Sequence, residues 1–305
     1  MPIQIFPQAS LSWTRRLTHL PPMSRVFARA LAVTPGRPSR LSPDTRIQQG
    51  RIQCKGIQIS KARQNRYNHV CQFQGDQLSP TLIQTLFIPL LGSYISGPLF
   101  PITPLGLIQT GQSIAQHRRV APGEKMDLSC SLLDMGQMEK GIRTRFYTEV
   151  KIQKELVWQG ISTYFTPTGQ GQKRQRKKES PLPLKERICL PEDTGRRYAK
   201  ASGDMNPHHL WVPTARIFGF KRPIAHGMWS LGRSFSSLAK TFDPAFPLYL
   251  DAGFKLPAFM PGTLNLGHGK RCSPSPGSTL VEFELRDAAT GRPHLKGGLK
   301  FPQTA

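Results

Sequence analysis

Apolar and polar residues alternate in several short segments of the chain, and this alternation predicts strands. The clearest segments are Arg51–Ser60, Thr144–Ile152 and Glu155–Phe165. A period of two is the pattern of a strand with one face buried and one face exposed. Turn residues such as Pro122-Gly123 separate the segments. The first half of the chain is therefore predicted to contain an antiparallel meander.

Two longer apolar stretches have the character of buried helices. Gln77–Tyr94 is apolar on most faces, as expected of a helix that a sheet wraps around. Ser79 can cap it, Pro80 fits its first turn, and Pro89 would kink or end it. The second stretch, Met228–Leu238, predicts another long helix.

The second half of the chain repeats the layout of the first. Tyr67 precedes Cys71 by four residues, as Tyr198 precedes Ser202. The paired strands at the end of the meander have counterparts at Thr279–Arg286 and His294–Phe301. Two similar units predict a tandem duplication.

Composition divides the chain further. Thr166–Glu186 is rich in Gly, Gln, Pro and basic residues, which cannot bury enough apolar surface to become ordered. The predicted segments are a basic N-terminal arm (1–50), a first repeat (51–166), a basic flexible linker (167–186) and a second repeat (187–305).

The 305 residues carry a formal net charge of +24, from 42 basic and 18 acidic side chains. Such a charge favours acidic partners, but no zinc finger, RNA-binding motif or helix-turn-helix is visible, so nucleic-acid binding is not expected as the main role. No apolar run reaches the ~20 residues of a membrane span. We therefore expect a soluble protein.

The cysteines and the N-terminus bear on the compartment. Five cysteines are scattered without a Cys-x-x-Cys pair, which favours a reducing environment over disulfides or structural zinc. Asp44 is the only acid in the first 50 residues, a composition that also fits a mitochondrial presequence. Because the rest of the chain is basic too, a cytoplasmic location is expected.

The stretch from Tyr198 to Trp229 contains the candidate chemistry. Asp204 precedes His209 by five residues, and Pro207 between them prevents one continuous helix. A carboxylate and an imidazole that share one water can act as a general acid and base. Taken singly, however, such an Asp is more often a turn residue or helix cap, and such a His is more often structural.

The whole string is more specific than the pair. It resembles the signature of the MaoC-like dehydratase family, the (R)-specific enoyl-CoA hydratases: Tyr-x-x-x-Ser-Gly-Asp-x-Asn-Pro-(Ile/Leu)-His. The residues in register are Tyr198, Ser202, Gly203, Asp204, Asn206, Pro207 and His209. Later matches are Ala215, Gly219-Phe220 and Ile224–Met228. His208 departs from the family, which has an aliphatic residue there.

The resemblance implies an α+β, tandem (double) hotdog fold, in which each unit wraps a curved antiparallel sheet around a long central helix. It also implies reversible hydration of trans-2-enoyl thioesters to (R)-3-hydroxyacyl thioesters, with Asp204 and His209 as the catalytic pair and Gly227 at the oxyanion hole. By the Tyr67/Tyr198 register Phe73 replaces Asp204, so the first repeat is expected to be catalytically silent.

Further expectations follow from the resemblance. No metal and no cofactor is expected, and the substrate would be an acyl thioester of coenzyme A or acyl-carrier protein. Ser202, Asn206 and His226 are expected to support the substrate site, although each also has a structural explanation. A homodimer of such chains is one assembly that the resemblance allows.

Three alternatives stay open. The first is a thioesterase on the same fold, which would need an acid on the central helix; Met228–Leu238 contains none. The second is a non-catalytic module that binds acyl thioesters. The third is a basic nucleic-acid binder, whose affinity would fall steeply with salt.

Overall fold

The computed structural model describes residues 11–42, 44–169, 180–273 and 276–303. The chain forms two compact units, and neither is continuous in sequence. Unit 1 contains the described residues up to Ile57, Leu86–Gln112 and the described part of Lys125–Glu179. Unit 2 contains Gln58–Thr85, Ser113–Glu124 and the described residues from Ser180 onward.

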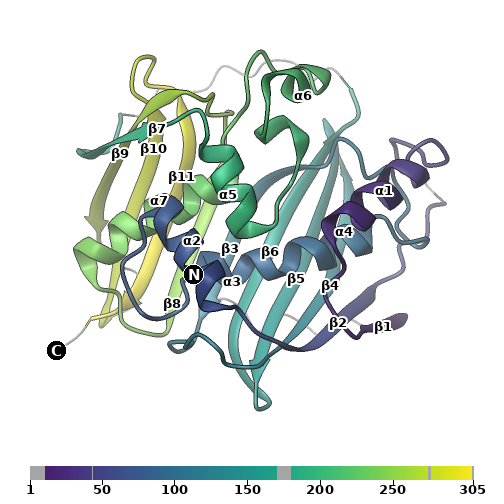
Figure 1. Cartoon of the computed structure of the whole chain (residues 1–305), viewed down its shortest axis with the longest axis horizontal. Helices are drawn as coiled ribbons and strands as arrows, with labels where there is room; N and C mark the ends of the chain where they lie inside the picture. Colours follow the sequence, from purple (N-terminus) through teal and green to yellow (C-terminus); the bar gives the residue numbers. More distant parts are fainter. Residues whose placement is uncertain (1–10, 43, 170–179, 274–275, 304–305) are drawn as a thin grey trace. The chain divides into compact units, whose positions relative to one another are not determined.

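Unit 1 is built on a mainly antiparallel sheet whose strand order is β1-β2-β4-β5-β6-β3 (Figure 1). Only the first part of β3, residues 108–112, belongs to this unit. β1 is parallel to β2, and the β2–β4, β4–β5 and β5–β6 pairs are antiparallel. The strands are β1 (Trp13–Leu17), β2 (Gly50–Ile57), β3 (Ile108–Gln116), β4 (Met126–Met138), β5 (Gly141–Ile152) and β6 (Glu155–Pro167).

The predicted helix Gln77–Tyr94 is broken into three pieces. α3 (Pro80–Gln84) is followed by a 3₁₀ turn (Thr85–Phe87) and then by α4 (Ile88–Ile95). Pro89 explains the break, because it has no N–H to donate to the carbonyl of Thr85 and its ring crowds that carbonyl. The kink or end that Pro89 was predicted to cause is thus seen four residues earlier in the chain, at Thr85.

Helices pack closely in unit 1. α4 contacts α1 (Met23–Val33), which lies in the predicted N-terminal arm. A Cβ on Gly92 of α4 would lie 2.3 Å from Cγ1 of Val26, so only glycine permits this contact. The ring of Tyr94 in α4 also packs against the sheet, with its centroid 5.2 Å from that of Phe146 in β5. The described part of the arm therefore contributes to the core of this unit.

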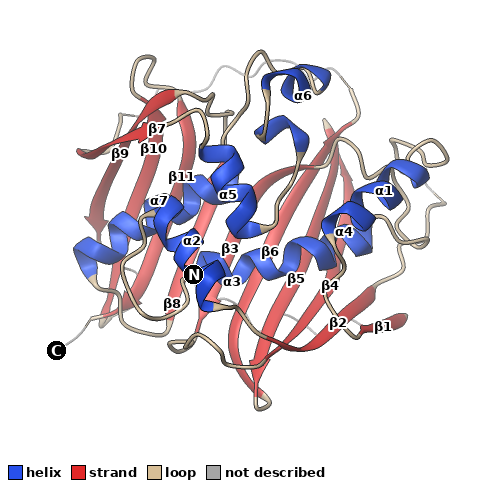
Figure 2. Ribbon diagram, viewed as in Figure 1, coloured by secondary structure: helices blue, strands red, loops and turns tan. Residues whose placement is uncertain are grey.

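In unit 2 the strands pair in the order β8-β11-β10-β9-β7, and each of these pairs is antiparallel (Figure 2). Its strands are β7 (Leu184–Leu190), β8 (Leu248–Phe254), β9 (Gly262–Arg271), β10 (Ser278–Asp287) and β11 (Pro293–Pro302). Besides α3, its helices are α2 (Lys61–Cys71), α5 (Thr194–Ser202), α6 (Val212–Ile217) and α7 (Gly227–Phe242), with a 3₁₀ turn η2 (Pro207–His209).

α7 is the central helix of unit 2, and it contacts β10, β11, α2 and α3. Indole Nε1 of Trp229 donates to the carbonyl of Val70 in α2 at 3.0 Å. A Cβ on Gly232 would lie 2.5 Å from the hydroxyl of Tyr67. The absence of a side chain at Gly232 therefore lets α2 approach α7 closely.

These contacts explain why the units differ from the predicted segments. Residues 58–85 come from the predicted first repeat, yet they pack with α5 and α7 in unit 2. Part of the predicted linker is also ordered, since β6 extends to Pro167 and β7 begins at Leu184. The rest of that linker, residues 170–179, lies outside the described residues. None of the helices in the described ranges is long and apolar enough to span a membrane.

Candidate active site

The candidate site begins where α5 ends. Gly203 caps the helix with φ +85°, a left-handed conformation that glycine adopts without strain, and its N–H donates to the carbonyl of Ala199 at 2.8 Å. The chain then turns through Asp204 and Asn206, and Pro207 starts the 3₁₀ turn η2, which ends at His209. The predicted bent segment is therefore present.

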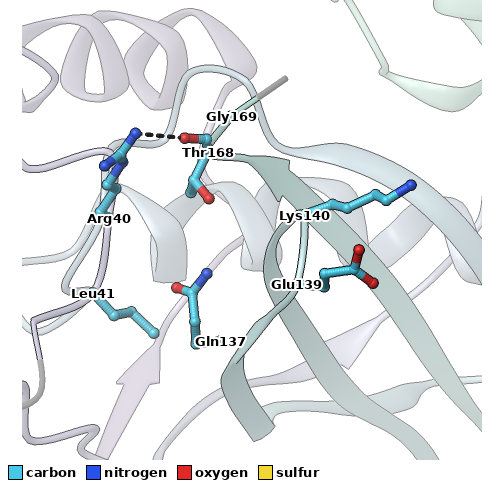
Figure 3. Close-up of a pocket in the computed structure, with 7 residues that line it drawn as sticks. All are labelled: Arg40, Leu41, Gln137, Glu139, Lys140, Thr168 and Gly169. Carbon is cyan, nitrogen blue, oxygen red and sulfur yellow. Dashed lines mark hydrogen bonds between the residues drawn. The ribbon is translucent and has the colours of Figure 1, made fainter. Parts of the chain in front are cut away.

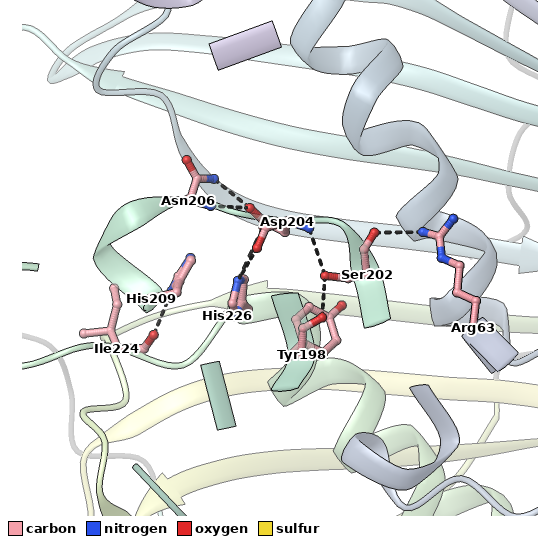
Figure 4. A network of polar contacts seen from close by, with 8 residues as sticks. All are labelled: Arg63, Tyr198, Ser202, Asp204, Asn206, His209, Ile224 and His226. Atoms are coloured by element: carbon pink, nitrogen blue, oxygen red, sulfur yellow. Dashed lines mark hydrogen bonds and ion pairs between the residues drawn. The ribbon is translucent and has the colours of Figure 1, made fainter. Parts of the chain in front are cut away.

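Local hydrogen bonds hold Asp204 in place (Figure 4). Its N–H donates to Oγ of Ser202 at 3.0 Å, and the Ser202 hydroxyl donates to the carbonyl of Tyr198 at 2.8 Å. Oδ1 of Asp204 accepts from the backbone N–H of Asn206 at 3.2 Å and from its side-chain amide at 2.9 Å. Ser202 and Asn206 therefore lie beside the candidate carboxylate and orient it.

His209 is buried, and one of its ring nitrogens is committed. Nδ1 lies 2.7 Å from the carbonyl oxygen of Ile224. Because a carbonyl can only accept, Nδ1 carries the proton and Nε2 of the neutral ring has a free lone pair. Burial, followed by the neighbouring His226 and His208, lowers the pKa of His209 well below its usual value, although Asp204 opposes this. The imidazole of His209 is therefore neutral at pH 7.

His226 contacts both members of the predicted pair. Its ring stacks on that of His209, with centroids 3.7 Å apart and planes at 27°. Its Nε2 lies 3.1 Å from the backbone oxygen of Asp204 and 4.0 Å from Oδ2 of the same residue. Burial lowers the pKa of His226 to about 3. The neutral His226 ring thus contacts both the Asp204 backbone and one face of the His209 ring.

Gly195 was missed by the sequence analysis, although it sets the position of η2. A Cβ at this residue of α5 would lie 1.9 Å from the carbonyl oxygen of His209. Only glycine lets the 3₁₀ turn approach the helix so closely. No signal in the sequence marked this contact, since Gly195 and His209 are separated by the loop.

His208, the departure from the family signature, packs among aromatic rings. Its centroid lies 4.0 Å from that of His209, 5.4 Å from Phe218 and 5.7 Å from Phe220. Burial lowers its pKa. A neutral imidazole therefore occupies the place of an aliphatic side chain, beside the ring of His209.

Gly227 is the first residue of α7 and directly follows His226. At the first position of a helix the backbone N–H has no carbonyl four residues earlier to bind within the helix. A Cβ here would lie 3.0 Å from the ring of Phe254. The N–H of Gly227 is therefore available at the positive end of the helix dipole, as an oxyanion donor must be.

Asp204, His209 and His226 also have the composition of a metal site. Each offers one ligand atom, and these atoms lie within 4.8 Å of one another. The two imidazoles, however, are stacked and nearly parallel. Lone pairs of parallel rings point side by side and do not converge on one point. The ligands of a tetrahedral ion, by contrast, do converge on one point. This geometry suits hydrogen bonds to a water better than it suits a metal.

Unit 1 has a hollow of about 350 Å³ (Figure 3). Arg40 at its edge donates to the carbonyl of Thr168 at 2.8 Å. The residues that line it are Arg40, Leu41, Gln137, Glu139, Lys140, Thr168 and Gly169. None of them is a predicted site residue; all of those lie in unit 2.

Comparison with known proteins identifies the domain that carries this geometry. Residues 167–260 match the family model described as MaoC like domain, and this range includes every predicted site residue. The chain carries a MaoC-like dehydratase domain. The resemblance stated from the sequence is confirmed.

A curated relative of this chain is 3-hydroxyacyl-thioester dehydratase X of Mycobacterium tuberculosis. The two are 26% identical over 226 residues, which cover 72% of this chain and 78% of the relative. A crystal structure of HtdX from the same organism has a TM-score of 0.69 and 23% identity, and the match covers 82% of this chain and 98% of that one.

Other solved structures agree on the fold. A MaoC-like dehydratase from Phytophthora capsici has a TM-score of 0.65 at 18% identity, with 87% of this chain and 100% of that chain covered. A conserved hypothetical protein of Mycobacterium tuberculosis, described as having a double hotdog fold, has a TM-score of 0.50 at 9% identity, with 95% and 93% covered. The predicted double hotdog fold is confirmed.

Proposed function

We propose that this protein is a hydro-lyase that adds water to trans-2-enoyl thioesters, or removes it from (R)-3-hydroxyacyl thioesters. The observation that carries the proposal is the state of His209. Its Nδ1–H donates to the carbonyl of Ile224, which leaves the lone pair on Nε2, and a ring nitrogen of His209 lies within 4.8 Å of a carboxylate oxygen of Asp204. The relative named as a 3-hydroxyacyl-thioester dehydratase supports the same reaction.

In the proposed hydration, Asp204 and His209 bind one water between them. Nε2 of His209 accepts a proton as the water oxygen forms a bond to C3 of the enoyl group. The pair then gives one proton to C2, so it is regenerated and one water has been added. Because the two groups interact closely, their protons belong to the pair. The N–H of Gly227 stabilises the negative charge on the thioester oxygen.

The proposed substrate is an acyl thioester of coenzyme A or of acyl-carrier protein, and no metal or dissociable cofactor takes part. His209, Asp204 and the backbone of Gly227 together supply a base, an acid and an oxyanion donor. Addition of EDTA is therefore expected to leave the rate of hydration unchanged.

The test is hydration of crotonyl-CoA and of a long-chain enoyl-CoA, followed as loss of enoyl-thioester absorbance. Asp204→Asn and His209→Ala are each expected to lower kcat by about 10²- to 10⁴-fold, because each removes a group that transfers protons. Matched controls are Asp76→Asn and His69→Ala, since both residues are exposed; these should retain wild-type activity. Chiral analysis of the product should give the (R)-3-hydroxyacyl thioester.

Other outcomes would separate the alternatives. Release of free thiol in place of hydration would identify a thioesterase. Saturable binding of acyl-CoA without turnover at any chain length would identify a non-catalytic module. Full activity in both the Asp204 and the His209 variants would place the site elsewhere.

A further inference from the structure

The side chain of Arg63 in α2 is hydrogen-bonded to the end of α5, the helix that precedes Asp204 (Figure 4). Its Nε donates to the carbonyl of Ala201 at 3.0 Å, and its Nη2 donates to the carbonyl of Ser202 at 2.8 Å. The same Nη2 lies 2.9 Å from Oγ1 of Thr85. One guanidinium thus joins α2, the residue that follows α3, and α5.

The two carbonyls that Arg63 contacts are at the C-terminal end of α5. The last carbonyls of a helix have no intrahelical N–H to accept from, and they carry the negative end of the helix dipole. A planar guanidinium can bind two such oxygens at once, which an ammonium cannot do with the same geometry. Among the described residues, no carboxylate forms an ion pair with Arg63. Its positive charge therefore interacts with the carbonyls at the C-terminal end of α5.

The contact fixes the point from which the catalytic loop departs. Ser202 is the last residue of α5, Gly203 turns the chain, and Asp204 follows. Oγ of Ser202 also accepts the N–H of Asp204. Any movement of this helix end therefore moves the carboxylate.

A second contact between the two helices lies one turn away. Tyr67 is four residues after Arg63 on α2, and Tyr198 is four residues before Ser202 on α5; their rings are 6.0 Å apart. Residues four apart lie on one face of a helix. α2 therefore meets α5 along one face over two turns, and Arg63 is the part of that face nearest to Asp204.

We infer that Arg63 is a positioning residue for the Asp204 carboxylate, supplied by a segment of the first repeat. The inference rests on the proposed hydratase function. The first repeat was expected to be silent because Phe73 replaces Asp204 in it. Its helix α2 instead serves the one acid–base pair of unit 2, which gives a reason for keeping this segment.

The experiment compares Arg63→Ala, Arg63→Lys and the control Arg66→Ala in the full chain. Arg66 is exposed on the same helix. With crotonyl-CoA, Arg63→Ala is expected to lose about 10- to 100-fold in kcat, with KM within about twofold, because a displacement of about 1 Å can cost that much. Arg63→Lys should fall between, and Arg66→Ala should match wild type.

Chemical rescue separates positioning from a merely structural role. Low millimolar guanidinium should raise kcat of Arg63→Ala several-fold and should leave wild type and Arg66→Ala unchanged. A loss of folded protein alone would lower the active fraction without such rescue. Circular dichroism and thermal unfolding establish which variants are folded.

The outcomes are distinguishable. If wild type hydrates enoyl thioesters and Arg63→Ala keeps its kcat within about twofold, the inference is overturned while the proposed function stands. If wild type turns over no enoyl thioester, the proposed function fails first. If Arg63→Ala does not fold, the kcat of Arg63→Lys decides: a loss at unchanged KM supports the inference, and an unchanged kcat overturns it.

Discussion

The two stacked histidines have different tasks even though their environments are similar. The ring nitrogen of His209 that faces away from Ile224 is free to accept a proton, whereas Nε2 of His226 donates to the backbone of Asp204. Both rings are neutral at pH 7 because burial opposes a charge. His209 can therefore be the base, while His226 holds His209 and Asp204 in position relative to each other.

At Gly227, substitution tests the oxyanion donor. Gly227→Ala places a Cβ 3.0 Å from the ring of Phe254, which should displace the backbone N–H by a few tenths of an ångström. We expect kcat to fall about tenfold, less than the 10²- to 10³-fold loss of a whole donor. The rate of crotonyl-CoA hydration measures this.

The control for Gly227→Ala is a second substitution that removes the crowding. Phe254→Leu leaves room for the new Cβ, so the double variant should recover part of the lost kcat. The single Phe254→Leu variant gives the baseline. No recovery in the double variant would argue against steric displacement as the cause.

At the scale of elements, the site depends on how closely α5 and η2 approach each other. The helix delivers Asp204 at its C-terminal end, and the 3₁₀ turn delivers His209. Gly195 is a residue at which the two elements are in close contact. The relative position of Asp204 and His209 is thus determined by packing between α5 and η2. The loop between these elements allows that packing but does not determine it.

Gly195→Ala is expected to disrupt this packing. The new Cβ would lie 1.9 Å from the carbonyl oxygen of His209, and a backbone atom cannot move aside cheaply. Overpacking of this kind costs about 1–3 kcal/mol of unfolding free energy, and sometimes more. Urea denaturation measures the loss, and kcat should fall with it.

A matched glycine is available for comparison. Gly269 in β9 has open space where its Cβ would be, so Gly269→Ala should change stability by less than about 1 kcal/mol. Equal losses in the two variants would show that the effect does not come from the contact with His209.

At the scale of the whole molecule, acid sensitivity is built into the burial of histidines. The pKa values of His208, His209, His226, His268 and His294 are all lowered, in each case chiefly by burial. In the unfolded chain each returns to about 6.5. The unfolded state therefore binds more protons below that pH, and folding stability rises with pH through this range.

For His226 the pH range follows from its folded pKa of about 3. The loss of folding stability that His226 causes is absent above about pH 6.5. It grows as the pH falls and is complete below about pH 3. Between about pH 6.5 and pH 3, His226 costs ~1.4 kcal/mol of stability per pH unit. Denaturant titrations between about pH 6 and pH 4 should show a smaller slope for His226→Asn than for wild type. His69→Asn replaces an exposed histidine and serves as the matched control.

The sequence by itself determined the local geometry of the segment from Asp204 to His209. The order Asp204, Asn206-Pro207, His209 enforces a bend after a helix, because proline cannot continue the helix and Gly203 can end it in a left-handed conformation. The strands and the central helix also followed from periodicity, since alternation and helical spacing are local properties. The break at residues 85–87 could be anticipated from Pro89 for the same reason.

Only the tertiary structure decided what surrounds that chemistry. The stacking of His226 on His209, the contact at Gly195 and the bonds from Arg63 to the end of α5 join residues that are far apart in the chain. Such contacts depend on which faces of the elements meet, and no local pattern in one sequence encodes that choice. For this reason residues 58–85, which lie within the predicted first repeat, are found in unit 2.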